Sequence, residues 1–488
     1  MGKRSRTFSP LFLKNNRMRY MRLLTVLFLS LIFSKGYGQL KNAERAYDGM
    51  RYAEAIGYYQ ESMKRDSLSA TAIAKLADSY DKTQQYQKAL YWYHKLLISQ
   101  VNDTASRYRY GQLLAMDGQY KAAATQFKWV NNVRPDSQLE STIGLYEGGL
   151  NALLADSVNW QTALLNINSG YADFSPVTYG AGLVFVSDRP RNKVFRETNA
   201  WTGGDFLTLY RVVDTARVKD AALRSKELEQ VLSYASKDLR NVDSRTESSW
   251  DSKKVSVNPQ ATFVAVPNQL SREMITPFNT KLNKRYHEGP VTFSRNWDSI
   301  IVTYNEPSKG KGDVSRLRLQ TYVMRYGDWI LQPAFPHNNK DYNVGQPALH
   351  PNGDVLFFTS DMPGGAGGKD IYYCRKSGNS WGLPINAGPL VNTSGNEMFP
   401  YIDPSGRLYF SSDKWPGLGG LDIFSVTLDT AYKPLSAPRN EGAPFNSPKN
   451  DFGVLIEANG SKGYFSSDRR GNDDIYIFWR IYPSLGRE

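Results

Sequence analysis

The C-terminal part of the chain alternates short apolar runs with turn sequences, a pattern typical of antiparallel β-strands. From Gly345 to Trp479 this pattern occurs three times, in copies that begin at Pro347, Pro400 and Gly453. Each copy contains an apolar run and a Ser-Asp pair, and in the first two copies a glycine-rich loop follows, where glycine allows positive φ and the Asp can satisfy backbone N–H groups of the turn. We therefore predict three or four short strands per copy.

The spacing of the copies predicts a ring of blades. The Ser-Asp pairs place Asp361, Asp413 and Asp468 at steps of 52 and 55 residues, and two earlier segments have the same order of motifs around Asp188 and Asn305. Periods near this length are typical of propellers and solenoids. Because one blade cannot bury both of its faces, neighbouring copies must supply the core. The sequence predicts an all-β propeller with five clear blades.

The stretch at about 212–274 is longer than this period allows. Its first part is charged and favours helix, whereas the part from Lys254 has apolar positions that suit strands. Residues 250–275 would then form a sixth blade. The alternative, a charged surface insertion on a five-bladed ring, stays open.

Residues 39–155 have a helical pattern with almost no proline. Tyr52, Tyr86 and Tyr120 are 34 residues apart, and each precedes an alanine by three residues and a second aromatic residue by seven. These later positions are Ala55, Ala89, Ala123, Tyr59, Tyr93 and Phe127. A generic amphipathic bundle explains the apolar spacing but not the constant phase. The pattern resembles the tetratricopeptide repeat. The predicted fold is therefore α+β multidomain, with an N-terminal α-solenoid followed by a propeller over residues 156–485.

Stacked helix pairs of this kind usually present a concave groove lined by the first helix of each pair. In that register Asp78, Lys82, Tyr108 and Gln112 face the groove, where they can hold an extended peptide or a partner loop. The alternative is that these residues are ordinary solvated positions.

A tryptophan in a propeller loop is a further candidate for partner binding. Trp415 in DKWPGLGG stands where the other copies have Met362 and Arg469, which suggests a position at the rim of a blade. The alternative is a tryptophan that folds back onto its own blade.

The net charge of +13 lies mostly in an N-terminal leader. Eight Lys and Arg residues precede residue 39, with no acidic residue among them, so the charge gives little support for a nucleic-acid partner. The apolar run 23–33 is too short for an ordinary transmembrane helix. We predict a signal peptide over residues 1–38, with Met21 as an alternative start, and a soluble periplasmic mature protein. The alternative is a retained membrane anchor.

The sequence motifs that could indicate catalysis or metal binding are incomplete or have a structural explanation. Residues 378–382 match G-x-S-x-G, but that motif requires a strand-to-helix turn and a later histidine, and no histidine follows Ser380. The glycine-rich loops lack the Walker lysine, and the four histidines are not at metal-binding spacings. Asp473 and Asp474 could bind calcium, although capping of a turn also explains them. We predict no catalytic, cofactor or metal residues, and a chain that is not an enzyme.

The combined pattern resembles a known family. The phrases YHEGPVTFS, GGKDIYY, NEMFPYID and LYFSSDKWPGLGGLDIF follow the helical repeats in order. They resemble the OmpA-family cell-envelope proteins of Bacteroidota with a TolB-like, WD-type propeller, over about residues 40–480. The resemblance implies a place near the type IX secretion and gliding machinery. Family members commonly continue into a peptidoglycan-binding OmpA-like domain, whereas this chain stops soon after Trp479, so direct peptidoglycan binding is not expected.

These features give two hypotheses for function. In the first, the chain is a noncatalytic periplasmic scaffold, peripheral to the outer membrane, that binds envelope proteins such as an outer-membrane barrel or a secretion or adhesin component. In the second, the propeller binds carbohydrate or acts as a glycosidase or lyase, which requires carboxylates that converge on a central pocket.

Overall fold

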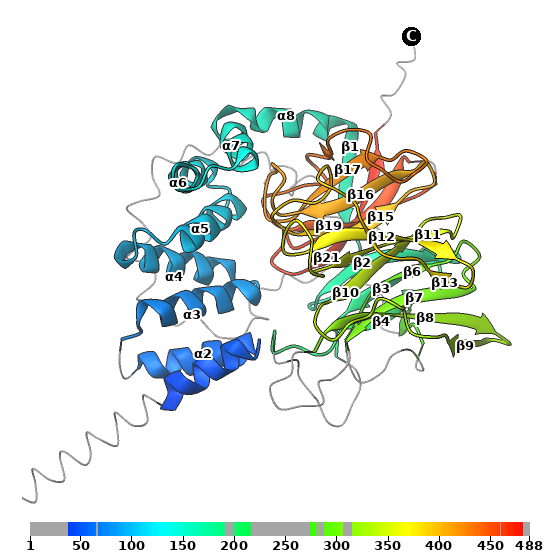
Figure 1. Ribbon diagram of the computed structural model, residues 1–488, viewed down its shortest axis with the longest axis horizontal. Coiled ribbons are helices and arrows are strands. Elements are labelled where there is room, and N and C mark those ends of the chain that lie inside the picture. Colours follow the sequence, from blue (N-terminus) through cyan, green and yellow to red (C-terminus); the bar gives the residue numbers. More distant parts are fainter. Residues whose placement is uncertain are drawn as a thin grey trace, which may run out of the picture. The chain divides into compact units, whose positions relative to one another are not determined.

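The structure is a computed structural model (Figure 1). It divides into two compact units. Unit 1 contains the chain up to Val101 together with Ala200–Gly203, and unit 2 contains the rest. The residues that the structure describes are 38–64, 67–190, 199, 201–215, 274–279, 282, 287–305, 315–458 and 460–481. The predicted signal peptide lies outside them, apart from residue 38. None of the helices in this described part is long and apolar enough to cross a bilayer.

Unit 1 is a stack of antiparallel helices. A helix over residues 38–48 is followed by α2 (Tyr52–Met63), α3 (Ala70–Lys82) and α4 (Tyr86–Ser99). Helix α3 packs against both α2 and α4. Ser69 caps α3 by accepting a hydrogen bond from the N–H of Ala72, at 3.2 Å.

Unit 2 begins with further helices. They are α5 (Thr104–Met116), α6 (Tyr120–Val133), α7 (Ser137–Gly144), a π-helical turn η1 (Leu145–Gly149), α8 (Leu150–Leu154) and a 3₁₀ turn η2 (Ala155–Asn159). Helices α5 and α6 approach closely at Gly111, where a Cβ atom would lie 2.5 Å from the ring of Phe127. Asp103 caps α5, and Asp136 caps α7 through the N–H groups of Gln138 and Leu139.

The predicted 34-residue period of the helices is confirmed. Tyr52, Tyr86 and Tyr120 are the first residues of α2, α4 and α6. The residues two positions earlier have positive φ: Met50 at 56°, Gln84 at 58° and Gly118 at 76°. The alanines that follow are fully buried, and the second aromatic residues are at most 5% exposed. The constant phase therefore reflects one helix-pair geometry that is used repeatedly.

The rest of unit 2 forms five antiparallel sheets, which are the blades of a propeller. Blade 1 contains β2 (Asp173–Tyr179), β3 (Gly182–Ser187), β4 (Thr208–Val212) and β5 (Ile275–Pro277). Blade 2 contains β6 (Glu288–Phe293), β7 (Ser299–Asn305), β8 (Leu317–Arg325) and β9 (Asp328–Leu331). Blade 3 contains β10 (Val344–Leu349), β11 (Val355–Ser360), β12 (Asp370–Ser377), β13 (Ser380–Trp381) and β14 (Ile385–Asn386). Blade 4 contains β15 (Glu397–Ile402), β16 (Arg407–Ser412), β17 (Asp422–Thr427) and β18 (Arg439–Asn440). Blade 5 contains β19 (Asp451–Ile456), β20 (Lys462–Ser467), β21 (Asp474–Arg480) and β1 (Trp160–Leu164).

The first strands of the blades line the inside of the ring. Strand β2 packs against β6, β6 against β10, β10 against β15, β15 against β19, and β19 against β2. The ring is closed by β1, which pairs with β21 from Trp160 opposite Arg480 to Leu164 opposite Tyr476. The first strand of the propeller in the sequence thus completes its last blade.

The closed ring settles the number of blades at five. The chain leaves blade 1 after β4 and returns at Ile275, where β5 pairs with β4. The segment predicted as an insertion at about 212–274 therefore lies between the third and fourth strands of blade 1, and most of it falls outside the described residues. The hypothesis of a sixth blade at residues 250–275 falls almost entirely outside the described residues, among which the ring closes with five blades and Ile275 belongs to blade 1.

Within unit 2 the helices pack on blade 4. The side-chain amide of Gln112 donates to the carbonyl oxygen of Asp413 at 3.3 Å, and the hydroxyl of Tyr120 donates to that of Leu418 at 2.9 Å. Leu418 and Ala443 form an apolar contact with Leu150, Leu153 and Leu154. Helices α5 to α8 are therefore part of the propeller unit rather than a separate arm.

Lys414 is the ionic part of this packing. Its ammonium lies 2.7 Å from the carboxylate of Asp136 and 5.2 Å from the ring centre of Tyr108, and only 9% of its side chain is exposed. Burial alone would raise the pKa of Asp136, but hydrogen bonds from Lys414 and from the N–H of Leu139 lower it overall.

We predict that Lys414→Met lowers the free energy of unfolding of unit 2 by about 2 kcal/mol, because a mostly buried charge pair loses one partner. The matched control is Lys128→Met on α6, whose partner Glu147 lies 2.5 Å away but whose side chain is 53% exposed. This exposed pair is expected to contribute less than about 1 kcal/mol. Urea unfolding followed by tryptophan fluorescence measures both changes, and equal losses would contradict the assigned role of Lys414.

Candidate functional site

The two groove residues predicted in unit 1 lie near the end of α3. The carboxylate of Asp78 accepts a hydrogen bond from the hydroxyl of Tyr47 at 2.9 Å and lies 4.0 Å from the ammonium of Lys82. The backbone carbonyl of Lys82 accepts a hydrogen bond at 3.0 Å from the indole N–H of Trp201. Asp78 and Lys82 therefore lie beside a surface on which another segment of the chain is already bound.

The two groove residues predicted in unit 2 lie on α5 and face the propeller. Gln112 bonds to the backbone at Asp413, and the ring of Tyr108 lies under the ammonium of Lys414. Both side chains are half-buried. The structure thus places them against a loop of their own chain, and their binding to another protein stays a prediction.

Trp415 is half-buried against its own propeller. It packs on the apolar core formed by residues of blades 3 and 4, and its indole N–H donates to the carbonyl oxygen of Val391 at 3.0 Å. The predicted correspondence with Met362 and Arg469 is wrong by one residue. Lys414 takes that place, because its N–H donates to the Ser hydroxyl two residues earlier, as the N–H groups of Met362 and Arg469 do.

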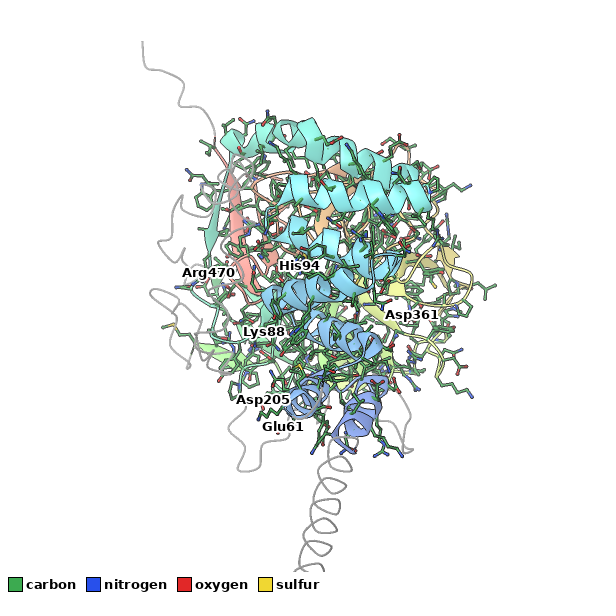
Figure 2. The ribbon with its side chains drawn as sticks, turned by 90° about the vertical axis from the view of Figure 1, so that its left-hand side faces the viewer. Glu61, Lys88, His94, Asp205, Asp361 and Arg470 are labelled. Carbon is green, nitrogen blue, oxygen red and sulfur yellow. The ribbon has the colours of Figure 1, made fainter. Side chains whose placement is uncertain are left out.

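The repeated Asp of the Ser-Asp pairs holds the start of the inner strand. Asp361, Asp413 and Asp468 each accept hydrogen bonds from the backbone N–H and the side-chain amide of one asparagine, at 2.5 to 2.8 Å. The asparagines are Asn343, Asn396 and Asn450, each directly before the inner strand of its blade. Asp361 is labelled in Figure 2. The prediction that this Asp satisfies backbone N–H groups is confirmed, but those groups lie 17 or 18 residues before the Asp rather than in the turn that follows it.

A second repeated acid, the Asp of the Asp-Ile pairs that begin at Asp370, Asp422 and Asp474, lies at the end of the loop that follows each Ser-Asp pair. Asp370 accepts hydrogen bonds from the N–H groups of Ala366 and Gly367, and the buried Asp422 accepts one from Gly419. Asp474 lies 3.7 Å from Arg470, which Figure 2 labels. Within the described residues no group of three or more His, Cys, Asp or Glu side chains is arranged to hold a metal ion.

The glycines of these loops allow neighbouring blades to touch. At Gly367 a Cβ atom would lie 2.4 Å from the carbonyl oxygens of Thr393 and Gly395, and at Gly419 it would lie 2.4 Å from that of Lys449. In the loop between β11 and β12, Gly364 is the one described glycine with positive φ, at 91°. Close approach, more than positive φ, therefore explains why these loops are rich in glycine.

A second set of acids begins the inner strands and is buried. In blades 1 and 5 these acids, Asp173 and Asp451, form ion pairs with Arg189 at 2.5 Å and with Arg469 at 2.6 Å. Each arginine is the residue directly after a Ser-Asp pair, and each guanidinium also lies over two aromatic rings of its blade. The arginine thereby joins the inner strand to the rest of its own blade.

Blade 4 departs from this arrangement at Glu397. The residue after its Ser-Asp pair is Lys414, which pairs with Asp136 on the helices. Glu397 is fully buried and accepts three hydrogen bonds of 2.7 Å, from the N–H and hydroxyl of Thr393 and from the hydroxyl of Ser412. Burial raises the pKa of Glu397 to about 7, and these hydrogen bonds offset only part of that rise.

Blade 1 departs at Asp188. Ala172 occupies the position that asparagine has in blades 3 to 5, so Asp188 accepts a backbone hydrogen bond of 2.7 Å but lacks the corresponding side-chain amide. Burial, together with the nearby charge of Asp173, raises the pKa of Asp188 to about 7. The sequence patterns gave no expectation that Glu397 and Asp188 would have perturbed pKa values. The signal was present, however, as one changed residue in each otherwise repeated pattern.

The G-x-S-x-G match at residues 378–382 lies in a β-hairpin. Ser380 lies in β13, an exposed edge strand that pairs with β12 after the turn at Gly378. A β-hairpin of this kind differs from the strand-to-helix turn of a nucleophile elbow.

The inner strands β2, β15 and β19 bring aromatic side chains together. The ring centre of Phe452 lies 4.6 Å from that of Phe399 and 5.9 Å from that of Phe174.

The fold defines a class of protein with helical repeats and a five-bladed propeller. No protein-family model matches the chain, and no curated protein matches its sequence. A mannose phosphorylase from Leishmania mexicana is similar in structure, with 12% identity, a TM-score of 0.37, and coverage of 70% of this chain and 95% of that one. An α-L-arabinofuranosidase from Podospora anserina has 10% identity, a TM-score of 0.33, and coverage of 67% and 98%.

A gluconolactonase from Xanthomonas campestris is also similar, at 11% identity and a TM-score of 0.27. The match covers 40% of this chain and 57% of that one, which is less than two thirds of its length. The three are enzymes by name, and the sequence expectation that the chain is not an enzyme is not upheld. At TM-scores below 0.5 the likeness assigns neither an activity nor a substrate to this chain.

Proposed function

We propose that this chain is a protein-binding adaptor of a bacterial cell envelope, peripheral to the outer membrane on its periplasmic side. The leader-like N-terminus and the resemblance to envelope proteins support this location. The observation that carries protein binding is in unit 1, where the helices hold a turn of the chain at Trp201 through one backbone hydrogen bond and one hydrogen bond from the indole N–H. A surface that binds one such segment has the chemistry to bind another.

The partners that we propose are an outer-membrane barrel or a component of secretion or adhesin export. Crosslinking of the chain in its native envelope, followed by mass spectrometry, tests this. We expect crosslinks from such a protein to unit 1, and we expect Lys82→Glu to weaken them, because it puts two carboxylates at the end of α3. Lys64→Glu is the matched control, since Lys64 is exposed at the end of α2 and pairs with Glu61. Envelope crosslinks that are absent, or unchanged in Lys82→Glu, would contradict the proposal.

Carbohydrate binding or turnover by the propeller is a second candidate. The observation that favours it is Asp188, a half-buried carboxyl whose pKa of about 7 suits a general acid near neutral pH. The test is a panel of sugar lactones and aryl glycosides with the unmodified chain and with Asp188→Asn. Turnover that Asp188→Asn abolishes would support this candidate, whereas turnover in neither protein would remove it.

A further inference from the structure

We propose that the ends of α2 and α3 form a receptor for a turn segment that carries a tryptophan, and that residues 201–203 of this chain, a turn closed by a 2.7 Å hydrogen bond from the N–H of Asn199 to the carbonyl oxygen of Gly204, occupy it until a partner segment displaces them. This inference rests on the proposed function and names its ligand class. The partner is a protein segment with an exposed tryptophan followed by small residues.

The tryptophan ring is held by contacts of two kinds. Its ring centre lies 4.9 Å from that of Tyr52, with the planes at 82°, an edge-to-face contact. Tyr52 is fixed in turn by an edge-to-face contact of 5.6 Å with Tyr47, whose hydroxyl donates to Asp78. The indole N–H of Trp201 donates to the carbonyl oxygen of Lys82 at 3.0 Å. The site thus recognises both the ring and its one hydrogen-bond donor.

The backbone partners explain why a separate segment can bind here. Lys82 is the last residue of α3, and its carbonyl oxygen has no partner within the helix. Ala53 is in the first turn of α2, and its N–H, also without a partner in the helix, donates to the carbonyl oxygen of Trp201 at 3.2 Å. The segment therefore supplies one donor and one acceptor to two helix ends. A tryptophan in a turn of another chain can supply the same pair.

The small residues after the tryptophan let the segment lie close to α2. Gly203 has a φ of 79°, and a Cβ atom there would lie 3.4 Å from that of Ala53. A larger residue at this point would be strained by its backbone angle. This geometry favours glycine two positions after the tryptophan in a partner.

The bound segment is suited to exchange. Its tryptophan remains accessible, since 39% of Trp201 stays exposed. Segment 201–203 follows β3 in the same chain, so it competes with a partner as an intramolecular ligand. The apparent affinity for a partner falls with the fraction of sites that are already filled. Removing the tryptophan of the chain should therefore strengthen binding of a free peptide.

The test uses a fluorescent peptide with the sequence of residues 199–205, Asn-Ala-Trp-Thr-Gly-Gly-Asp, and the chain from residue 39 onward. Anisotropy titration should show at least about tenfold tighter binding to Trp201→Ala than to the unmodified chain. The same peptide with alanine in place of tryptophan should not bind. Adding Tyr52→Phe to Trp201→Ala should preserve binding, because the ring is kept, whereas adding Tyr52→Ala should abolish it.

Equal affinity of Trp201→Ala and the unmodified chain, or binding that survives Tyr52→Ala, would overturn the inference. Thermal melting of each variant separates loss of binding from loss of folding. The outcome is distinguishable from that of the crosslinking experiment. Peptide binding as described, without envelope crosslinks, would contradict the proposed envelope adaptor and support the tryptophan receptor. Envelope crosslinks without peptide binding would support the adaptor and contradict the receptor.

Discussion

Replacing Gly419 by alanine is expected to lower the free energy of unfolding of unit 2 by about 3 kcal/mol. The added Cβ would lie 2.4 Å from the backbone of Pro448 and from the carbonyl oxygen of Lys449. Backbone atoms cannot move aside as the end of a flexible side chain can, so blades 4 and 5 must separate locally. Urea unfolding monitored by tryptophan fluorescence and by far-UV circular dichroism measures the loss.

The same substitution has the opposite expected sign at Gly144. This glycine is the last residue of α7, and a Cβ atom there meets nothing within 4 Å. Alanine stabilises a helical position by about 0.5 to 1 kcal/mol relative to glycine, so Gly144→Ala should be neutral or slightly stabilising. Similar losses for the two variants would show that close approach of the blades is not what Gly419 provides.

Raising the pH from 5 to 8 is expected to destabilise unit 2 through Glu397. The pKa of this glutamic acid is raised from an ordinary 4.5 to about 7 in the folded chain. Its contribution is fully present below about pH 4.5 and is lost as the pH rises through 7, because the unfolded chain ionises first. A rise of this size corresponds to about 3 kcal/mol.

Glu397→Gln removes this contribution while keeping the shape of the side chain. The amide oxygen can accept the hydrogen bond from the N–H of Thr393, and the amide nitrogen can donate to the hydroxyls of Thr393 and Ser412. We expect the stability of the variant, relative to the unmodified chain, to be about 2 to 3 kcal/mol higher at pH 8 than at pH 5.

The control for the pH experiment is Glu140→Gln, at an exposed position on α7. Its stability relative to the unmodified chain should not change between pH 5 and 8. Asp188 also has a raised pKa and adds to the pH dependence of every variant, which is why the difference between proteins is the quantity to compare. A pH-independent difference for Glu397→Gln would contradict the assignment.

The two perturbed carboxyl groups arise where the repeat is interrupted. In blades 1 and 5 the arginine after the Ser-Asp pair forms an ion pair with the acid of the inner strand. In blades 3 to 5 the asparagine before the inner strand donates its side-chain amide to the Asp of the Ser-Asp pair. Lys414 and Ala172 break the pattern, and Glu397 and Asp188 are the acids affected. Lys414 has a different use, as the contact between blade 4 and helix α7.

The sequence by itself determined the repeating parts of this protein. The 34-residue phase of Tyr52, Tyr86 and Tyr120 predicted three repeated helix pairs, and the Ser-Asp spacing predicted the blades, because local turn chemistry and burial recur with each unit. It likewise predicted that the Asp of the Ser-Asp pair accepts hydrogen bonds from backbone N–H groups, although the groups that it binds lie 17 or 18 residues earlier. These features depend on residues near one another in the chain, so a linear pattern contains them.

Only the tertiary structure decided what depends on contacts between distant residues. Strand β1 joins β21 across more than 300 positions, and Lys414 meets Asp136 across 278. The closing of the ring at five blades, the packing of α5 to α8 on blade 4, and the place of Trp201 on α2 and α3 follow from such contacts. Their partners are not related by any period, because each contact occurs once.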